Sequence, residues 1–523
     1  MPTRPLFHAG MFTLIGFAVS LAGGCARYHA LPLDARADQR ALASPDMERI
    51  RRDAARIHHP LLKPVHLVWA RGLTPDQIAV VAVLGNPDLR AVRDQQRVAQ
   101  AQLLQAGLLP NPELSLKQER PKAGSPPDIT TGHSTQVGWR LDALWERGLK
   151  RQIAKDQAGS VDLGIAWKEW QVAQAARLAA YALLALEAQE PLEQKVLTEA
   201  RATSEALKRA VRAGAAGTAE AAPARLAFDQ ERQRAQAMEE ALSQARQHLN
   251  GLLGLPPDAP TLLRSGVPLP EWKHLPSMAE LLQGLGERRL DLLAFRQGYA
   301  SRDADYRLAV REQFPAIGIL VGRALDPEGI ATLSLGASLS LPFFNRNQGR
   351  IAEARASRRA LHDAFQARLF EARAQIAQLL TRLGSMDAQI EAAQDALGPL
   401  AASAQAYRAG LKAGATDRLA VARAQMACLD QELRVARLQA ERAALGVQLE
   451  LVSGVYLPGD GMGILRNASN IQDREAEGEG GLPRGTPGNR EVPSHGPENG
   501  RQPGKIRSLR LGMSHIGRGQ DRG

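Results

Sequence analysis

The hexapeptides DLRAVR at residues 88–93 and DLLAFR at residues 291–296 open two stretches of the same design, about 200 residues apart. Each begins with a helical segment that ends at a proline, Pro112 in the first stretch and Pro315 in the second. A short run with strand character, a loop, a second such run, a very long helix, a turn and another helix follow. Internal repetition is read first because it sets the architecture. We therefore expect a helix–β-hairpin–long helix–turn–helix unit used twice, with long helices carrying a few strands at one end.

The clearest strand pattern lies at residues 334–341, where apolar side chains alternate without a fault with polar or small ones. The apolar positions are Leu335, Ala337, Leu339 and Leu341, and the others are Ser334, Gly336, Ser338 and Ser340. A period of two is expected where one face of a strand meets lipid or a core and the other meets water. Residues 317–322, 136–141 and 114–117 alternate in the same way, so the sequence predicts four strands in two hairpins.

Four strands are too few for a membrane barrel, since single-chain barrels have at least about eight. An open sheet in lipid would leave the backbone groups of its edges unpaired. If the strands lie in a membrane, several copies of the chain must share one closed barrel, and three copies would supply twelve strands. The alternative is two soluble hairpins that pack on a periplasmic surface, which alternation alone does not exclude.

The helices after each hairpin have exceptional predicted lengths, residues 145–211 and 348–409. At 1.5 Å per residue, roughly 60 residues make a rod of roughly 90 Å. Apolar positions such as Ile376, Leu379 and Leu383 recur at a spacing of three to four, which is typical of coiled-coil-like packing. Turns predicted at 212–214 and 408–410 lead into return helices that end near residues 253 and 453.

The chain divides into six predicted regions, which are listed here by residue number. They are a signal peptide at 1–24, an N-terminal segment at 25–72, a first repeat at 73–255, a Pro-rich linker at 256–275, a second repeat at 276–457 and a tail at 458–523. Glycine, proline and charge dominate the tail, which predicts disorder. The N-terminal segment contains His58 and His59, which we interpret as solvent-facing loop histidines rather than metal ligands.

An export signal is predicted at the N-terminus. Residues 12–22 form an apolar core that is too short to span a membrane as a mature helix. This core ends in LAGGC at residues 21–25, which resembles a bacterial lipobox, although Ala22 occupies the place of the usual leucine. The resemblance predicts a lipid on Cys25, and the neighbouring Ala26 resembles the signal of outer-membrane lipoproteins. The alternative is an ordinary signal peptide in which Cys25 is incidental.

Composition argues against several classes of function. The net charge of +11 would permit nucleic-acid binding, but aromatic residues make up only 4% and the basic residues are spread among acidic ones along helices. A solvated helix surface explains that pattern better, so we expect no nucleic-acid partner. The two cysteines, Cys25 and Cys428, offer no disulfide framework. We find no phosphate loop, metal-ligand spacing or nucleophile elbow, and therefore expect no enzyme, cofactor or metal.

Three motifs occur in a specific order and spacing: NPDL at residues 86–89, QAGLLPNPEL at 105–114 and LSLPFFNRNQGR at 339–350. With the duplication, they make residues 73–455 resemble the TolC-type outer-membrane factors, the exit ducts of bacterial tripartite efflux pumps and type I secretion systems. The resemblance implies a homotrimer with a twelve-stranded β-barrel in the outer membrane, continued by a periplasmic α-helical barrel. It also implies a periplasmic adaptor and an inner-membrane pump of the resistance-nodulation-division (RND) or ABC type as partners.

The resemblance also implies functional residues near the predicted turns. An aspartate after the second turn narrows the pore in this family, and Asp417 fits that position, while Ala420 stands where a second aspartate would be. The alternative for Asp417 is a helix-start carboxylate favoured by the helix dipole. Gly214, Gly410 and Leu411 resemble the tips where an adaptor docks, or are simply residues of a glycine helix end.

We therefore expect a passive exit duct, lipid-anchored at the outer membrane. Residues 342–349 are closest to the ducts of heavy-metal cation pumps, with drug efflux and type I protein secretion as alternatives. A periplasmic coiled-coil scaffold lipoprotein is an alternative of a different class, which should lack the alternating strands. A hydrolase in unrecognised loops is a third.

Overall fold

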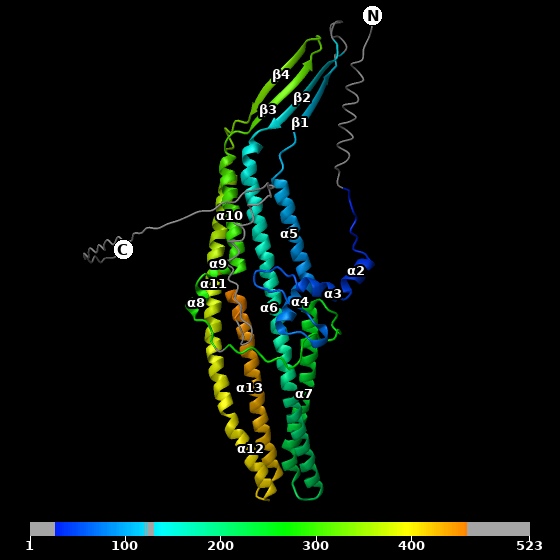
Figure 1. Ribbon diagram of the computed structural model, residues 1–523, viewed down its shortest axis with the longest axis vertical. Coiled ribbons are helices and arrows are strands. Elements are labelled where there is room, and N and C mark those ends of the chain that lie inside the picture. The colour runs from blue at the N-terminus through cyan, green and yellow to red at the C-terminus, as the bar shows by residue number, and fades with distance from the viewer. Residues whose placement is uncertain (1–26, 121, 123–129, 273, 458–523) are drawn as a thin grey trace, which may run out of the picture. The chain divides into compact units, whose positions relative to one another are not determined.

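The computed structural model describes residues 27–120, 122, 130–272 and 274–457 (Figure 1). All of them belong to the first of two compact units of the chain, which ends at Gln472. The predicted signal peptide, Cys25 and the predicted tail at 458–523 lie outside the described residues. Within those residues, no helix combines the length and the apolar character needed to cross a membrane.

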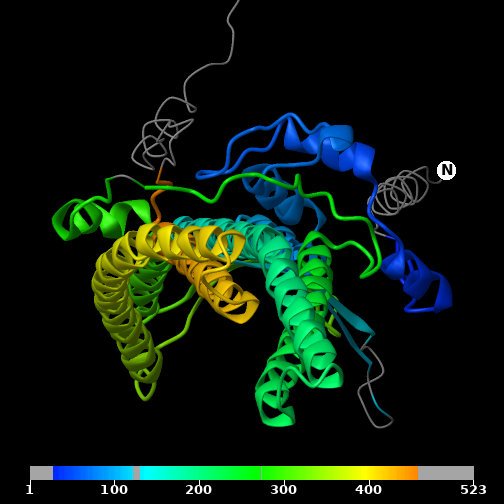
Figure 2. The same ribbon diagram turned by 90° about the horizontal axis from the view of Figure 1, so that it is seen from below.

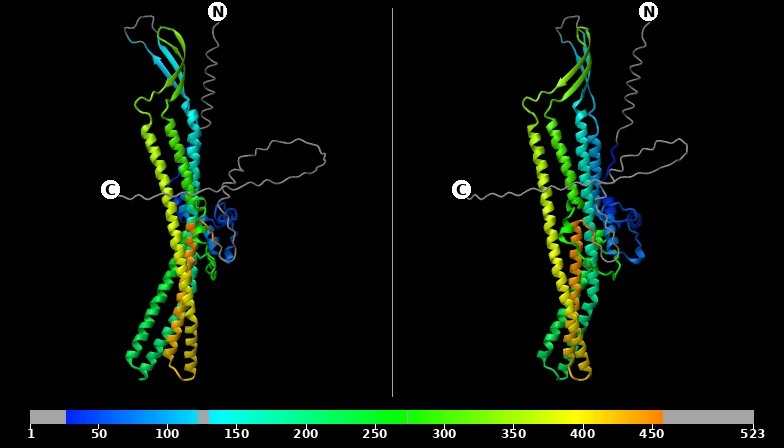
Figure 3. Two further views of the ribbon diagram at one scale, coloured as in Figure 1. Left: turned by 90° about the vertical axis from the view of Figure 1, so that its left-hand side faces the viewer. Right: turned by 60° about the vertical axis from the view of Figure 1, so that its left-hand side comes forward.

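The elements follow the predicted unit twice. The first half contains α2 (Ala35–Leu42), α3 (Met47–Ala54), η1 (Trp69–Arg71), α4 (Pro75–Gly85), α5 (Pro87–Ala106), β1 (Glu113–Glu119), β2 (Gly132–Arg140), α6 (Asp142–Arg212) and α7 (Thr218–Leu253). The second half contains α8 (Met278–Leu282), α9 (Leu285–Arg288), α10 (Leu290–Arg311), β3 (Ile317–Leu325), β4 (Ala331–Leu339), α11 (Gln348–Asp395), α12 (Leu397–Lys412) and α13 (Arg418–Ser453). Figure 3 shows the strands at one end of the long helices and the turns after α6 and α12 at the other.

Side-chain capping explains how the first repeat begins. The Thr74 hydroxyl accepts a hydrogen bond from the Gln77 N–H at 3.4 Å, and the Gln77 side chain accepts one from the Thr74 N–H at 3.0 Å. Such a reciprocal cap satisfies two backbone donors at the helix start. The Asn86 side chain then accepts from the N–H groups of Asp88 and Leu89, so that α5 starts separately from α4. The chain is therefore interrupted between Gly85 and Pro87, and the two helices are separate.

The first long helix is slightly longer than predicted, and the second is divided into two helices. Helix α6 has 71 residues and continues through Pro191, which corresponds to about 105 Å. Pro191 is exposed, so water can bond the carbonyl that loses its N–H partner. The second rod ends later than predicted, at Lys412, and Ala396 divides it into α11 and α12.

The second predicted turn is wrong by four residues. Gly410 and Leu411 lie within α12, and the chain reverses at Gly414, whose φ of +73° suits glycine. The first turn is where we predicted it, at Gly214, with a φ of +69°. The local sequence misleads because an Ala-Gly pair occurs at 409–410 and again at 413–414.

The four strands form one antiparallel sheet in the order β1-β2-β3-β4. The predicted strands are confirmed, and the pairing of β2 with β3 joins the hairpins of the two repeats. Leu341 and Leu141 lie outside the strands: β4 ends at Leu339, and Leu141 caps α6.

The linker and the N-terminal segment pack on the helices from one side, as Figure 2 shows. Leu73 and Leu263 form a parallel β-bridge that ties the linker to the start of α4. Trp272 is 3% exposed, and its ring covers Gly446 of α13 so closely that an added Cβ would lie 1.9 Å from it. Gly446 is therefore required for this contact.

His59 is not a solvent-facing histidine. Its side chain is 1% exposed, and its Nε2 lies 3.0 Å from the Ala166 carbonyl of α6. Its Nδ1 accepts hydrogen bonds from the N–H groups of Leu61 and Leu62. Since Nδ1 faces two donors, the neutral ring with its proton on Nε2 fits this site. Burial lowers the pKa of His59 below its ordinary value.

We expect this histidine to make stability depend on pH. A lowered pKa means that the folded state favours the neutral ring, so its contribution is complete above about pH 6.5 and is lost as the pH falls. The midpoint of thermal unfolding should fall less between pH 7 and pH 5.5 in His59→Asn than in the unchanged protein. His58→Ala, which removes the exposed neighbour, should behave like the unchanged protein. Equal pH dependence in His59→Asn and the unchanged protein would contradict this role.

Candidate functional site

One face of the sheet is apolar and exposed. The row Leu114, Val137, Val321 and Leu335 crosses all four strands, because the register pairs each residue with the next. These side chains are 63%, 43%, 47% and 83% exposed, respectively. The same face also carries the exposed residues Leu116, Ile317, Ile319, Leu325, Leu333 and Leu339. A contiguous apolar surface of this kind marks a site of interaction with lipid or protein.

The opposite face is mainly polar or small. The neighbouring row consists of Ser115, Gln136, Gly322 and Ser334. Adding a Cβ at Gly322 would place it 2.9 Å from the Ser334 hydroxyl, so glycine allows β3 and β4 to pack closely on this side. The prediction that alternate residues of 334–339 lie on opposite faces of the sheet is therefore confirmed.

Both edges of the sheet lack a partner strand among the described residues. β1 pairs only with β2, and β4 pairs only with β3. Exposed edges leave backbone N–H and C=O groups ready to pair with another strand. A sheet with an exposed apolar face and two free edges is a structure that further copies of the chain can complete.

The two helix turns at the far end have the same geometry. In the first, the N–H of Gly214 donates to the Val211 carbonyl at 3.1 Å and that of Ala215 to Ala210 at 2.9 Å. In the second, the N–H of Gly414 donates to Leu411 at 3.1 Å and that of Ala415 to Gly410 at 2.8 Å. This bonding pattern is a Schellman motif with glycine in the left-handed conformation. The repeat therefore extends to the tips.

The duplicated turn makes Asp417 and Gly217 equivalent positions. Each is the N-cap residue of its return helix, but only Asp417 has a side chain to bond. Asp417 Oδ1 accepts a hydrogen bond from the Ala420 N–H at 2.7 Å, and the residue is exposed. The helix-start role is thus present, and it leaves the second carboxylate oxygen free for another role.

The comparisons with known proteins agree with this architecture. The family described as outer membrane efflux protein matches residues 281–455. Residues 281–455 are an outer membrane efflux protein domain. The proteins of this family are channels rather than enzymes. Among curated proteins, none matches this chain.

Solved structures of outer-membrane channels share the fold. CusC, whose structures concern folding and transmembrane channel formation, is 18% identical, with a TM-score of 0.58 over 76% of this chain and 97% of that chain. The CmeC outer membrane channel of Campylobacter jejuni is 14% identical, with a TM-score of 0.62 over 77% and 89%. The MtrE outer membrane channel of Neisseria gonorrhoeae, solved in an open state, is 17% identical, with a TM-score of 0.59 over 76% and 97%. At these identities the likeness concerns the fold.

In this protein, a buried ion pair joins the two repeats. Arg177 of α6 and Glu450 of α13 are in direct contact, and their side chains are 5% and 0% exposed. Arg177 also lies 2.9 Å from Asp76 of α4 and stacks over the ring of Tyr456 at 4.9 Å. The N–H of Leu457 donates to Glu450 at 3.2 Å. Three segments that are far apart in sequence therefore meet around one guanidinium.

A second ion pair joins the same two helices closer to the turns. Arg437 of α13 lies 2.7 Å from Glu193 of α6, and the arginine is 60% exposed. Glu193 is 6% exposed, but water reaches the guanidinium and screens the pair, so this contact is weaker than a fully buried one. The buried Arg177 pair is the stronger constraint on how α13 lies against α6.

The predicted residues thus fall into three groups. Gly214 and Asp417 lie at the tips, Gly410 and Leu411 lie one turn away inside α12, and Cys25 lies outside the described residues. Sequence analysis missed Gly414, although the parallel AGA triplets at 213–215 and 413–415 would have indicated it. It also missed Arg177, because nothing in the sequence around a single arginine in a long helix indicates that the arginine is buried. Among the described residues, no group of three or more side chains could hold a metal ion.

Proposed function

We propose that this protein is the outer-membrane exit duct of a tripartite efflux system and conducts substrates passively out of the periplasm. The observation that carries the proposal is the four-stranded sheet, apolar and exposed on one face and unpaired at both edges. A lipid bilayer is a suitable environment for such a face, and strand pairing between copies satisfies such edges. A coiled-coil scaffold would have no use for this sheet.

Three copies would close the sheet. β1 and β4 run antiparallel within one chain, so the β4 edge of one copy can continue into the β1 edge of the next as another antiparallel pair. Three copies of four strands give a twelve-stranded barrel. The polar face at Ser115, Gln136 and Ser334 would then line the pore, and the long helices would continue it into the periplasm as an α-helical barrel.

We infer partners and substrates from the family resemblance. The tips at Gly214 and Gly414, with Gly410 and Leu411 beside the second, would dock a periplasmic adaptor that leads to an inner-membrane pump. The resemblance of residues 342–349 to the ducts of heavy-metal cation pumps favours metal cations, and with them an RND pump, over drugs or secreted proteins. A lipid on Cys25 stays a prediction.

Asp417 is the proposed gate residue. Three carboxylates close to one axis repel each other and concentrate cations, and salt screens the effect. In planar bilayers at low salt, Asp417→Asn should raise the conductance of the resting channel and lower its preference for cations. Asparagine removes the charge but still caps a helix about as well as aspartate does.

Asp417→Ala removes both the charge and the helix cap, so a comparison with Asp417→Asn separates the two effects. If the gate depends on charge, the Asn and Ala variants should conduct alike and both should differ from the unchanged protein. A change in Asp417→Ala alone would assign Asp417 to helix capping only. A protein that inserts but never conducts would reject the duct and favour the scaffold.

A further inference from the structure

The two repeats differ where the sheet meets the long helices. Only Leu141 separates β2 from α6, whereas residues 340–347 separate β4 from α11. We call residues 340–347 the connector. The duplicated fold does not need this extra length, since the first repeat makes the same transition with one residue. The connector is therefore a candidate for a function of its own.

The connector has a defined conformation. The N–H of Ser340 donates to the Ala316 carbonyl at 3.1 Å, and Asn347 Nδ2 donates to the Ala309 carbonyl of α10 at 2.8 Å. Asn347 has a φ of +61°, the only positive φ of a non-glycine residue in the described part of the chain. Such a conformation costs free energy and persists only where its surroundings hold it. The connector nevertheless exposes Phe343 by 71% and Phe344 by 97%.

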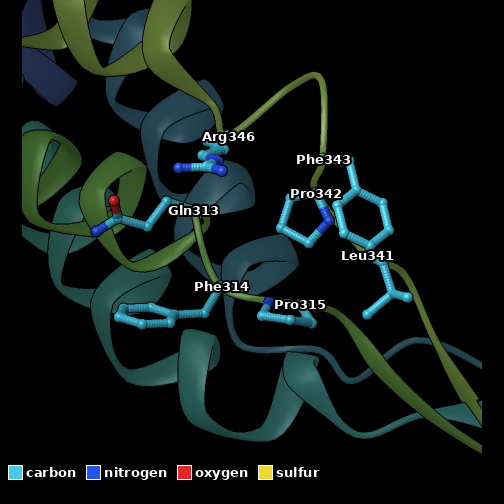
Figure 4. Close-up of a pocket in the computed structure, with 7 residues that line it drawn as sticks. All are labelled: Gln313, Phe314, Pro315, Leu341, Pro342, Phe343 and Arg346. Atoms are coloured by element: carbon cyan, nitrogen blue, oxygen red, sulfur yellow. The ribbon is translucent and has the colours of Figure 1, made fainter.

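The connector forms one wall of an open cleft of about 420 Å³ (Figure 4). The other wall follows α10 and consists of Gln313, Phe314 and Pro315, and the connector contributes Leu341, Pro342, Phe343 and Arg346. Figure 4 shows Arg346 and Gln313 at one end of the cleft and Leu341 at the other. The cleft is thus apolar along most of its length and cationic at one end, which is the polarity of an amphiphile.

The cleft continues the apolar face of the sheet. Ile317 and Leu339 form the last cross-strand pair of β3 and β4 at the helical end and are 39% and 55% exposed. Pro315 and Leu341 of the cleft each lie two residues beyond this pair. If the apolar face contacts the acyl region of a bilayer, the cleft lies at its border, where exposed aromatic side chains are typical of membrane proteins.

Arg346 gives the cleft its charge preference. The side chain is exposed and makes no ion pair with any described carboxylate. Other arginines nearby are paired: Arg350 lies 2.5 Å from Asp305, and Arg358 lies 2.8 Å from Asp303. An unpaired guanidinium at the border of a membrane suits the phosphate of a lipid, to which it can donate two hydrogen bonds.

We propose that the cleft binds an anionic phospholipid of the membrane, with its acyl chains against Phe314, Leu341 and Phe343 and its phosphate at Arg346. This inference rests on the proposed function, because it takes the apolar face of the sheet to lie in the bilayer. The bound lipid fills the cleft between the connector and the residues that follow α10.

The test measures binding of phosphatidylglycerol and of zwitterionic phosphatidylcholine to the purified full-length protein in detergent, by native mass spectrometry. The unchanged protein should prefer phosphatidylglycerol. Arg346→Gln should lower its affinity for phosphatidylglycerol by about fivefold, the effect of one arginine at a lipid surface, and leave phosphatidylcholine binding unchanged. Arg346→Lys should retain most of the preference, and Phe343→Ser should weaken both lipids.

Arg359→Gln is the matched control, since Arg359 lies on α11 at 85% exposure, away from the cleft. No lipid preference in the unchanged protein, or equal effects of Arg346→Gln and Arg359→Gln, overturns the proposal. If Arg346→Gln and Phe343→Ser lose the oligomer but still bind lipid, the cleft contacts a second copy of the chain. That result also overturns the proposal. The proposed function is tested separately, by conduction in planar bilayers. If the unchanged protein conducts, the proposed function stands whatever the lipid-binding result. If the unchanged protein never inserts into bilayers, the proposed function is rejected.

Discussion

Replacing Arg177 by methionine should lower the free energy of unfolding by about 3–5 kcal/mol, because it leaves a buried carboxylate without its partner. Glu450 is fully buried and touches Arg177. The double variant Arg177→Met/Glu450→Leu should recover most of the loss, because apolar packing replaces both charges. The midpoint of denaturation in guanidinium chloride measures both effects.

Two comparisons sharpen this prediction. Arg437→Met breaks the pair with Glu193 between the same helices and should cost less than Arg177→Met, because the guanidinium that it removes is 60% exposed and water can take its place beside Glu193. Equal losses in Arg177→Met and Arg437→Met would show that burial of the first pair is unimportant. No recovery in the double variant would show that Arg177 acts through its other contacts, such as Asp76 and Tyr456.

The cost of Arg177→Met should also depend on pH. Burial raises the pKa of Glu450 from 4.5 to about 7, and Arg177 opposes this rise. Because the folded state then binds the proton more tightly, Glu450 makes stability fall as the pH rises from about 4.5 through about 7. Without Arg177 the charged form is less favourable still. The loss caused by Arg177→Met should therefore be larger at pH 8 than at pH 5.

Arginine at Val137 should prevent stable insertion into the membrane, whereas arginine at the adjacent Gln136 should be tolerated. The two residues are neighbours on β2 and point to opposite faces of the sheet. An arginine facing lipid near the centre of the bilayer costs about 2–4 kcal/mol per copy, and one facing a wet pore costs little. If three copies share one barrel, the cost of Val137→Arg applies three times.

The readout is the amount of heat-resistant oligomer in isolated outer membranes, with total protein measured beside it. We expect Val137→Arg to lose this oligomer and Gln136→Arg to keep it. Equal amounts in both variants would show that the apolar face does not contact lipid. Loss in Gln136→Arg alone would reverse the assignment of the faces.

Most of the local structure could be predicted because its signals are local. Alternation with a period of two placed β4 within three residues at its start and two at its end. The second tip could not be placed in the same way, because Gly410 and Gly414 both follow an alanine. Only the reversal of the chain, with Asp417 capping α13, selects Gly414.

By itself the sequence determined the duplication, the long helices, the strands and their two faces, because each depends on residue periods and on caps within a few positions. Only the tertiary structure decided that β2 pairs with β3 to make one sheet, that His59 is buried as a neutral ring, and that Arg177 meets Glu450. These features join residues that lie 100 or more positions apart, such as His59 and Ala166. Their stability depends on burial, and the burial of a polar group follows from how whole helices pack and not from its neighbours in sequence.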